Sequence, residues 1–467
     1  MSRHSLAFVA AFAALAGGCR AEERPDVLLV VLDTLRADAV SSYGNARPTT
    51  PQLDALAAAG VRFADATAPA PWTWPSHASL FTGLMPWEHG AQAASASGEV
   101  QLKGTPYAMT PMDPAVPTLA ERLTSAGYRT VAVVGNPFLA PELGLVRGFG
   151  EVRNDTRDTA VVAAALEAMR ERDDPLFLFV NLVTTHGPHL ATPAPWARAR
   201  LEELAPERAQ AWSLPYLTVS PPGLQLAARA GSRGLTASQR YALGELEIPP
   251  DGLRLLRDLY DGEALLADFL LHTLVTAWEA RGGDVVAVTS DHGEYFGEHH
   301  QLSHGRTLYR EVLAVPLVIA APGRLPAGAV VEEPVQLQDL YPTLLELAGL
   351  SPPPLAHAYS LVPVAGGATR PGRVLAAATP SRFWAEEGGA WSRSFRLCRE
   401  GADVEIVDDL GAVERFDLAT DPGMTRGTPA WRSALGCPRA TTALERPAVD
   451  VPAPLAERLA ALGYVSP

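Results

Sequence analysis

The stretch Thr73-Trp74-Pro75-Ser76-His77-Ala78-Ser79-Leu80-Phe81-Thr82-Gly83 predicts a helix with a reactive residue at its N-terminus. We expect Thr73 at the N-cap, Pro75 in the first turn and Gly83 at the end of the helix. A helix N-terminus offers free N–H groups and the positive end of the helix dipole, which bind tetrahedral oxyanions. A threonine hydroxyl there would have its alkoxide form stabilised. Taken alone, however, the stretch fits an ordinary capped surface helix better.

Two apolar runs in the flanking sequence change this interpretation. Residues 27–32 are apolar and lead into Asp33, and the largely apolar residues 285–290 lead into Asp291 and His292. Runs of this length are typical of parallel strands that are covered on both faces. Sites in open α/β sheets lie at the carboxyl ends of such strands. We therefore expect Asp33, Asp291 and His292, together with Thr73, to hold a divalent metal.

Further motifs follow along the chain, and in this order they resemble the sulfatase-like branch of the alkaline phosphatase superfamily. Thr73-x-Pro75-x-His77 stands in the place of the sulfatase motif C-x-P-x-R, and Thr82-Gly83 in the place of T-G. The other matching segments are Pro86-Trp87-Glu88-His89-Gly90, Ser290 to Glu294, His304 to Tyr309, Val315-Pro316-Leu317, Pro322-Gly323, Asp339 to Leu345 and the tail Leu459 to Tyr464.

The resemblance implies an α/β fold with two parts. The larger is a three-layer α/β/α alkaline-phosphatase-like domain with a mostly parallel central sheet, which we expect over residues 24–365 with an insertion at about 191–250. The smaller is a C-terminal antiparallel α+β subdomain over residues 366–467. Residues 253–279 predict a long amphipathic helix. Its expected core face consists of Leu256, Leu259, Leu266, Leu270, Leu274 and Trp278.

The N-terminus predicts export. Residues 1–19 combine Arg3 and His4 with a short apolar run and small residues before Cys19, as in a signal peptide, and we favour the lipoprotein type. Plain signal-peptidase cleavage and an uncleaved anchor remain open. All three versions send the protein out of the cytoplasm, and we expect it in the periplasm or cell envelope. In the favoured version its membrane contact is only through a lipid on Cys19.

Charge and cysteine content limit the partners and the chemistry. The net charge of −14 argues against nucleic acid or anionic lipid as a partner. Besides Cys19, only Cys398 and Cys437 are present. They would form a disulfide in an oxidising compartment or remain free thiols, and the spacing does not decide between these alternatives.

The resemblance also assigns roles to histidines. It implies that His189 donates a proton to the leaving group and that His304 contacts the substrate oxyanion and takes part in catalysis. It places the remaining candidates at the substrate, and these are His77, His89, Asn136 and His186. Asn136 stands where many sulfatases carry a sulfate-binding lysine, and Thr34 stands where they carry a second metal-binding aspartate. We expect one metal, with Mn²⁺ or Zn²⁺ favoured and Ca²⁺ as an alternative.

The nucleophile position departs most from the family. Sulfatases convert Cys or Ser there to formylglycine, and Thr73 cannot give that aldehyde because its β-carbon carries a methyl group. We therefore predict a phosphoester or phosphonate ester hydrolase. The alternatives are a sulfatase that works without formylglycine, a phospho-group transferase and a non-catalytic surface protein that binds anions. The expected substrate is an anionic ester: a lipid headgroup, a glycan or a small molecule.

Overall fold

The computed structural model describes residues 24–93, 109–171, 175–189, 194–204, 237–242, 244, 246–370, 374–379, 395–408, 411–430, 433–435, 437 and 455. The predictions for residues 1–19, for Cys19 and for the tail after Leu459 lie outside this set. Among the described residues, no helix has both the length and the apolar character needed to cross a bilayer.

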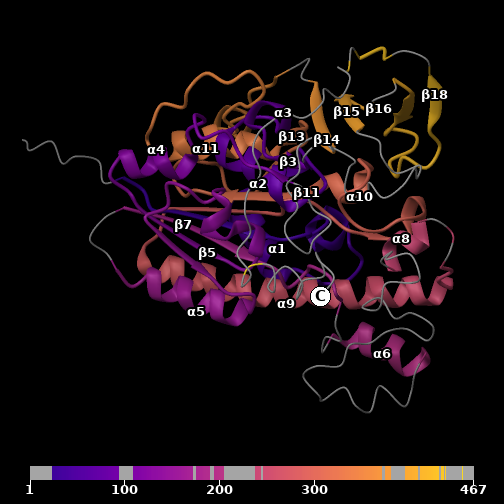
Figure 1. Ribbon diagram of the computed structural model, residues 1–467. Helices are drawn as coiled ribbons and strands as arrows, with labels where there is room; N and C mark the ends of the chain where they lie inside the picture. Colours follow the sequence, from indigo (N-terminus) through magenta and orange to yellow (C-terminus); the bar gives the residue numbers. More distant parts are fainter. Residues whose placement is uncertain are drawn as a thin grey trace, which may run out of the picture.

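A mostly parallel sheet forms the centre of the molecule (Figure 1). Its strands run in the order β12-β2-β11-β8-β1-β7-β5-β6, with β13 also paired to β2, and β11 is antiparallel to both of its neighbours. The strands are β1 (Val27–Leu32), β2 (Val61–Thr67), β5 (Arg129–Val134), β6 (Glu151–Asn154), β7 (Leu176–Leu182), β8 (Val285–Thr289), β11 (Ala314–Ala320), β12 (Ala329–Val331) and β13 (Val335–Gln336).

Helices cover both faces of this sheet, because alternate side chains of its buried strands point to opposite sides. In β1, Val27, Leu29 and Val31 join one apolar cluster, and Leu28, Val30 and Leu32 join another. One face carries α1 (Pro51–Ala59), α5 (Asp158–Ala168) and α9 (Pro250–Arg281). The other carries α2 (Thr73–Thr82), α4 (Leu119–Ser125), α11 (Leu340–Leu347) and α12 (Val362–Ala365). The short helix α3 (Pro86–His89) packs against α2. The predicted three-layer fold is confirmed.

The antiparallel sheet of the C-terminal part is a separate element (Figure 1). Its strands follow one another in sequence as β14 (Leu375–Thr379), β15 (Phe395–Glu400), β16 (Asp403–Asp408), β17 (Val413–Asp417) and β18 (Thr428–Ala430). Cys398 of β15 forms a disulfide with Cys437, and their Cα atoms lie 5.5 Å apart. The structure thus selects the disulfide over two free thiols.

Short elements complete the described chain. In the predicted insertion, two helices are described, α6 (Pro195–Leu204) and α8 (Ala237–Ala242). The remaining pieces are β3 (Gln92–Ala93), β4 (Met109–Thr110), β9 (Tyr295–Phe296), β10 (Leu302–Ser303), α10 (Arg310–Leu313) and six short 3-10 helices at Ala37–Ala39, Ser41–Tyr43, Pro137–Leu139, Pro141–Leu143, Glu298–His300 and Leu337–Asp339.

Two local predictions need correction. Thr73 is the first residue of α2 and Trp72 is its N-cap, so the Thr73 hydroxyl is not used for capping and turns elsewhere. In α9, Leu266 is 41% exposed, because the buried stripe of this helix runs through Tyr260, Ala264 and Ala267. The end of α2 at Gly83 is as predicted, and Gly83 has the positive φ of 72° that favours glycine.

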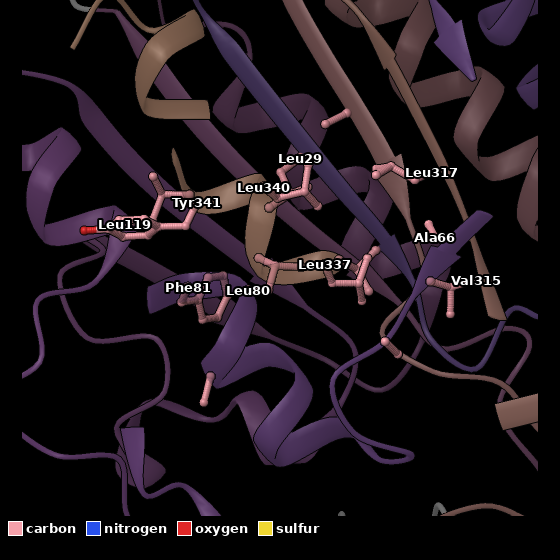
Figure 2. Packing of buried hydrophobic residues seen from close by; sticks show 14 of the residues in the cluster. Leu29, Ala66, Leu80, Phe81, Leu119, Val315, Leu317, Leu337, Leu340 and Tyr341 are labelled. Atoms are coloured by element: carbon pink, nitrogen blue, oxygen red, sulfur yellow. The ribbon is translucent and has the colours of Figure 1, made fainter. Parts of the chain in front are cut away.

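Packing against the sheet fixes the position of α2. Leu80 and Phe81 of this helix lie in the same buried cluster as Leu337, Leu340 and Leu29 (Figure 2). All ten residues of α2 are buried. An element buried on every side cannot shift without opening a cavity, so its first turn is held rigidly at the sheet edge.

The aromatic packing behind this turn yields a stability prediction. Phe179 of β7 is fully buried, and its ring meets Phe81 edge to face at 5.0 Å and lies 6.0 Å from the His77 ring. We expect Phe179→Ala to lower the free energy of unfolding by about 3–5 kcal/mol, because it leaves a cavity beside α2. Urea unfolding followed by circular dichroism measures this. Phe179→Leu refills most of the space and should lose clearly less; equal losses would contradict the cavity argument.

Candidate metal centre and active site

The site lies where four neighbouring parallel strands end. Strands β8, β1, β7 and β5 are adjacent, and the register pairs Val31 with both Thr289 and Asn181. Parallel strands in register bring their carboxyl ends to one edge of the sheet. Asp33, Asp291 and Asn136 lie one or two residues after three of these strands and therefore meet there.

Asp33 is held by one of its two carboxylate oxygens. Its Oδ2 accepts hydrogen bonds from Asn136 Nδ2 at 2.8 Å and from Asn181 Nδ2 at 3.3 Å. Its Oδ1 is buried and accepts no hydrogen bond from the described part of the chain. The two amides therefore orient Asp33 so that one oxygen stays available to a ligand.

Asp291 and His292 show the same division. Asp291 Oδ1 accepts from the backbone N–H groups of Thr34 and His292 at 3.1 and 3.0 Å, and no hydrogen bond from a described residue reaches Oδ2. His292 Nδ1 lies 3.0 Å from the carbonyl oxygen of Gly293, so Nδ1 carries the proton and Nε2 presents its lone pair. This Nε2 lies 3.4 Å from Asp291 Oδ2 and 4.0 Å from Asp33 Oδ1.

These three side chains fit a divalent cation. One ligand atom from each of Asp33, Asp291 and His292 lies within 4.8 Å of the other two, and all three residues are buried. Burial raises the pKa of both carboxyls, and the charge of Asp291 raises that of Asp33 further. Two buried carboxylates are costly without a cation between them. Two carboxylate oxygens and one imidazole are an ordinary protein ligand set for a divalent metal.

Thr73 adjoins this cluster. Its Oγ1 lies 3.4 Å from His292 Nε2 and accepts a hydrogen bond from Asn136 Nδ2 at 3.2 Å. The orientation of the Asn136 amide follows from its other end, because Oδ1 accepts the backbone N–H of Phe138 at 2.9 Å. Asn136, predicted as a substrate ligand, thus contacts Thr73 and Asp33.

His77 lies behind the cluster. Its Nδ1 lies 3.0 Å from the carbonyl oxygen of Thr73 and 3.4 Å from Asp291 Oδ2. Burial lowers the pKa of His77 although the neighbouring Asp291 opposes this, so the imidazole is neutral at neutral pH. Ser76 Oγ also donates to the Asp291 carbonyl at 2.7 Å. The first turn of α2 is therefore tied to the Asp291 loop without a fixed positive charge.

A group of histidines surrounds the other side of His292. The His304 ring centroid lies 4.4 Å from that of His292 and 5.1 Å from that of His186. His304 Nδ1 pairs with Glu294 Oε2 at 3.1 Å. Burial would raise the pKa of Glu294, but His304 and neighbouring histidines lower it to about 2, so this carboxylate is ionised. His186 donates Nδ1–H to the Gly187 carbonyl at 2.6 Å, and burial followed by His304 lowers its pKa to about 3.

The two remaining predicted residues occupy different surroundings. His189 Nδ1 lies 2.7 Å from Glu263 Oε2, and its ring packs against Tyr260 and Phe296. His89 bonds to Ser79 Oγ through Nε2 and to the N–H of Ala91 through Nδ1, each at 3.0 Å. His89 therefore ties the end of α3 to α2. Each of its two ring nitrogens forms a hydrogen bond to another residue of the protein.

Comparison with known proteins now places the chain. The Sulfatase family model matches residues 25–350. The chain belongs to the sulfatase family. This family forms part of the alkaline phosphatase superfamily, and the protein is accordingly a hydrolase acting on ester bonds.

The sequence identity to individual relatives is low, but the similarity extends over most of the chain. The Delta 4,5-hexuronate-2-O-sulfatase of Bacteroides thetaiotaomicron is 25% identical over 392 residues, 74% of this chain and 73% of that protein. The phosphonate monoester hydrolase of Agrobacterium radiobacter superposes with a TM-score of 0.63 at 21% identity, over 86% of this chain and 91% of that one. The phosphonate monoester hydrolase of Silicibacter pomeroyi gives 0.60 at 20% identity, over 88% and 91%. These two structures support the fold.

Sequence reasoning missed the residues that hold the sulfatase-like site in place. Asn181 was detectable as the single polar residue in the apolar run 176–182, and Glu263 as a charge on the apolar stripe of α9. Glu294 was recognised within a motif but was given no role. The hydroxyl of Thr34, in the place of the second aspartate, is used in a hydrogen bond to the protein: its Oγ1 donates to the Thr185 carbonyl at 2.6 Å.

The paired buried carboxylates predict how Asp33→Asn changes stability. The pKa of Asp33 is raised in the folded metal-free protein, so the cost of its charge is absent below the unfolded pKa and grows as pH rises through the folded one. We expect Asp33→Asn to raise the melting temperature of metal-free protein at neutral pH by at least about 2 °C. The gain should shrink on acidification, and added metal should stabilise only the wild type.

Asp258 offers a matched control for this measurement. It is also buried but pairs with Arg47 at 2.6 Å, so Asp258→Asn should lower the melting temperature of the same metal-free protein. Differential scanning calorimetry with and without chelator measures both variants. A lower melting temperature for metal-free Asp33→Asn at neutral pH would contradict the proposed charge repulsion.

Proposed function

We propose that this protein is a metal-dependent hydrolase that cleaves phosphoester or phosphonate ester bonds through Thr73. The observation that carries the proposal is the position of Thr73 Oγ1, which lies 3.4 Å from His292 Nε2 and 3.2 Å from Asn136 Nδ2. A non-catalytic anion-binding protein would not need this hydroxyl at the metal ligands. A transferase of the same chemistry differs only in the acceptor, so the same experiments address it.

The choice of phosphorus over sulfur rests on the nucleophile. Threonine cannot become formylglycine, whose hydrate has a second hydroxyl group to expel sulfate. A sulfate ester on Thr73 would lack that route. A phosphate or phosphonate ester on Thr73 can be attacked by water at phosphorus. The named phosphonate monoester hydrolases with this fold support the same class of substrate.

Asp33, Asp291 and His292 would hold the metal, with Thr73 Oγ1 as a further ligand. When bound, a divalent ion would lower the pKa of the threonine hydroxyl and neutralise charge on the substrate. The imidazole in this set favours Mn²⁺ or Zn²⁺ over Ca²⁺, which prefers oxygen ligands throughout. Metal content of the purified protein, followed by reconstitution with each ion, decides the identity.

The residues of the chain account for both steps. Thr73 Oγ1 attacks phosphorus, the Oγ1–P bond forms and the bond to the leaving oxygen breaks. The hydroxyl proton passes to solvent, and His189 or His304 protonates the leaving oxygen. Water then attacks phosphorus and the Oγ1–P bond breaks, which restores the threonine. Asn136 donates to Oγ1 and stabilises its anionic form before attack.

A sulfuric ester hydrolase that works without formylglycine is the second candidate. The relative from Bacteroides thetaiotaomicron carries a sulfatase name and is similar over 74% of this chain. Under this alternative, a metal held by the same three residues would bind a sulfate ester. The natural substrate in either case is an anionic ester of a lipid headgroup, a glycan or a small molecule.

We also propose that the protein acts in the periplasm or cell envelope. The leader-like residues 1–19 and the disulfide between Cys398 and Cys437 support an oxidising compartment. A lipid on Cys19 would attach the protein to the membrane. Membrane fractionation of wild type and Cys19→Ala tests this attachment.

Turnover by Thr73 variants tests the proposed function. We expect Thr73→Ala to lower kcat/KM on aryl phosphodiesters and phosphonate monoesters by about 10³-fold or more, because it removes the nucleophile. Thr73→Ser keeps a hydroxyl and should retain most of the activity. Initial rates on the metal-loaded protein measure both.

Ser76→Ala provides the matched control, because Ser76 is the other hydroxyl in the first turn and points to the Asp291 carbonyl. It should lose far less activity than Thr73→Ala. Turnover of aryl sulfate alone by the wild type would move the assignment to the sulfatase alternative. Unchanged activity in Thr73→Ala would remove Thr73 as the nucleophile.

A further inference from the structure

Glu263 is a carboxylate in an otherwise apolar stripe of the long helix α9. It is 4% exposed, and the neighbouring buried residues of the helix include Leu259 and Ala267. Burying a charge in such a stripe is costly unless a partner compensates it. The partner is His189, whose Nδ1 lies 2.7 Å from Glu263 Oε2.

The same turn of α9 also supports the metal ligands. Tyr260 precedes Glu263 by three residues, so both side chains leave the same face of the helix. The Tyr260 hydroxyl donates to the Thr34 carbonyl at 2.8 Å and accepts the backbone N–H of Arg36 at 2.7 Å. One rigid turn therefore fixes the segment after Asp33 and the ring of His189 together.

His189 and His186 belong to the same loop but differ in their partners. His186 donates Nδ1–H to the carbonyl of Gly187, a neutral partner, and burial lowers its pKa to about 3. Burial would also lower the pKa of His189, but Glu263 outweighs burial and raises it. The other titratable groups around His189 are Tyr260 on α9 and Glu294 after β8, and Glu294 acts in the same direction. His189 is thus the member of this pair whose carboxylate partner favours the protonated imidazole.

We propose that Glu263 is a positioning residue that makes His189 the general acid of the reaction. By accepting the Nδ1 proton, Glu263 fixes the ring and leaves the Nε2 proton for the leaving oxygen. As the bond from phosphorus to that oxygen breaks, its electron pair takes the Nε2 proton and His189 becomes neutral. The water that hydrolyses the ester on Thr73 gives one proton back to Nε2 and bonds to phosphorus through its oxygen. The Oγ1–P bond breaks, and Thr73 Oγ1 takes a proton from solvent. This inference rests on the proposed function. It assigns the role of proton donor, left there as His189 or His304, to His189.

Leaving groups of different basicity test the inference. We compare 4-nitrophenyl and phenyl esters of phenylphosphonic acid on the metal-loaded enzyme, because 4-nitrophenolate leaves without a proton and phenolate needs one. Glu263→Gln should lower kcat on the phenyl ester by about 10²-fold while changing the 4-nitrophenyl ester little. His189→Gln should show the same pattern. In wild type, kcat for the phenyl ester should fall as pH rises through the pKa of His189. In Glu263→Gln this fall should occur at lower pH, because the carboxylate that raises this pKa is gone.

Glu311→Gln is the matched control, since Glu311 pairs with His299 Nε2 at 3.1 Å in a similarly buried histidine–carboxylate pair. It should leave the ratio of the two rates unchanged. Equal losses on both esters in Glu263→Gln would overturn the inference, because they would show a purely structural contact. Absence of turnover in the wild type would instead count against the proposed function.

A measurement independent of activity distinguishes failure of the Glu263 inference from failure of the proposed function. Histidine titration by NMR, with the His189 signal identified from the His189→Gln spectrum, should show a lower pKa for His189 in Glu263→Gln and no change in Glu311→Gln. An unchanged His189 titration in Glu263→Gln would overturn the positioning role, whichever ester the enzyme hydrolyses.

Discussion

The meeting of two buried carboxylates, Asp33 and Asp291, is the constraint on which the rest of the structure depends. Each uses one oxygen in hydrogen bonds to the protein and turns the other toward His292 Nε2. Burial and mutual repulsion raise the pKa of Asp33, so the folded chain holds an electrostatic cost that a cation relieves. Such a cost persists only where the surrounding fold is rigid enough to prevent the two groups from separating.

The sheet and two helices provide this rigidity. Adjacent parallel strands β8 and β1 fix the separation of the carboxylates, because each aspartate follows its strand closely. Helix α2 is buried along its whole length and binds the Asp291 loop through Ser76 and His77. Helix α9 covers the opposite face and reaches the segment after Asp33 through Tyr260. Thr73 is thus placed by packing that extends through all three layers.

Much of this was predictable from the sequence, for identifiable reasons. The apolar runs before Asp33 and Asp291 mark buried strands, and the order of the motifs indicates the family, so the fold and the candidate metal site follow. Hydrogen-bond partners that come from distant elements leave no such pattern. Glu263 lies 74 residues beyond His189, and Asn136 was assigned to the substrate because only its sequence position was known. In the structure its amide bridges Asp33 and Thr73, a contact that only the folded geometry determines.

The polar groups around the metal ligands explain why a threonine fits this site. Sulfatases place an arginine where this chain has His77, and the imidazole here is neutral because burial lowers its pKa. Positive charge near Thr73 therefore depends on the metal and on any protonated histidine rather than on a fixed guanidinium. Asn136, in the place of a lysine, donates a hydrogen bond to Oγ1 without adding charge. In the proposed mechanism, the hydroxyl of Thr73 would therefore rely for its activation on a cation held by Asp33 and Asp291, which would couple the nucleophile directly to the metal centre.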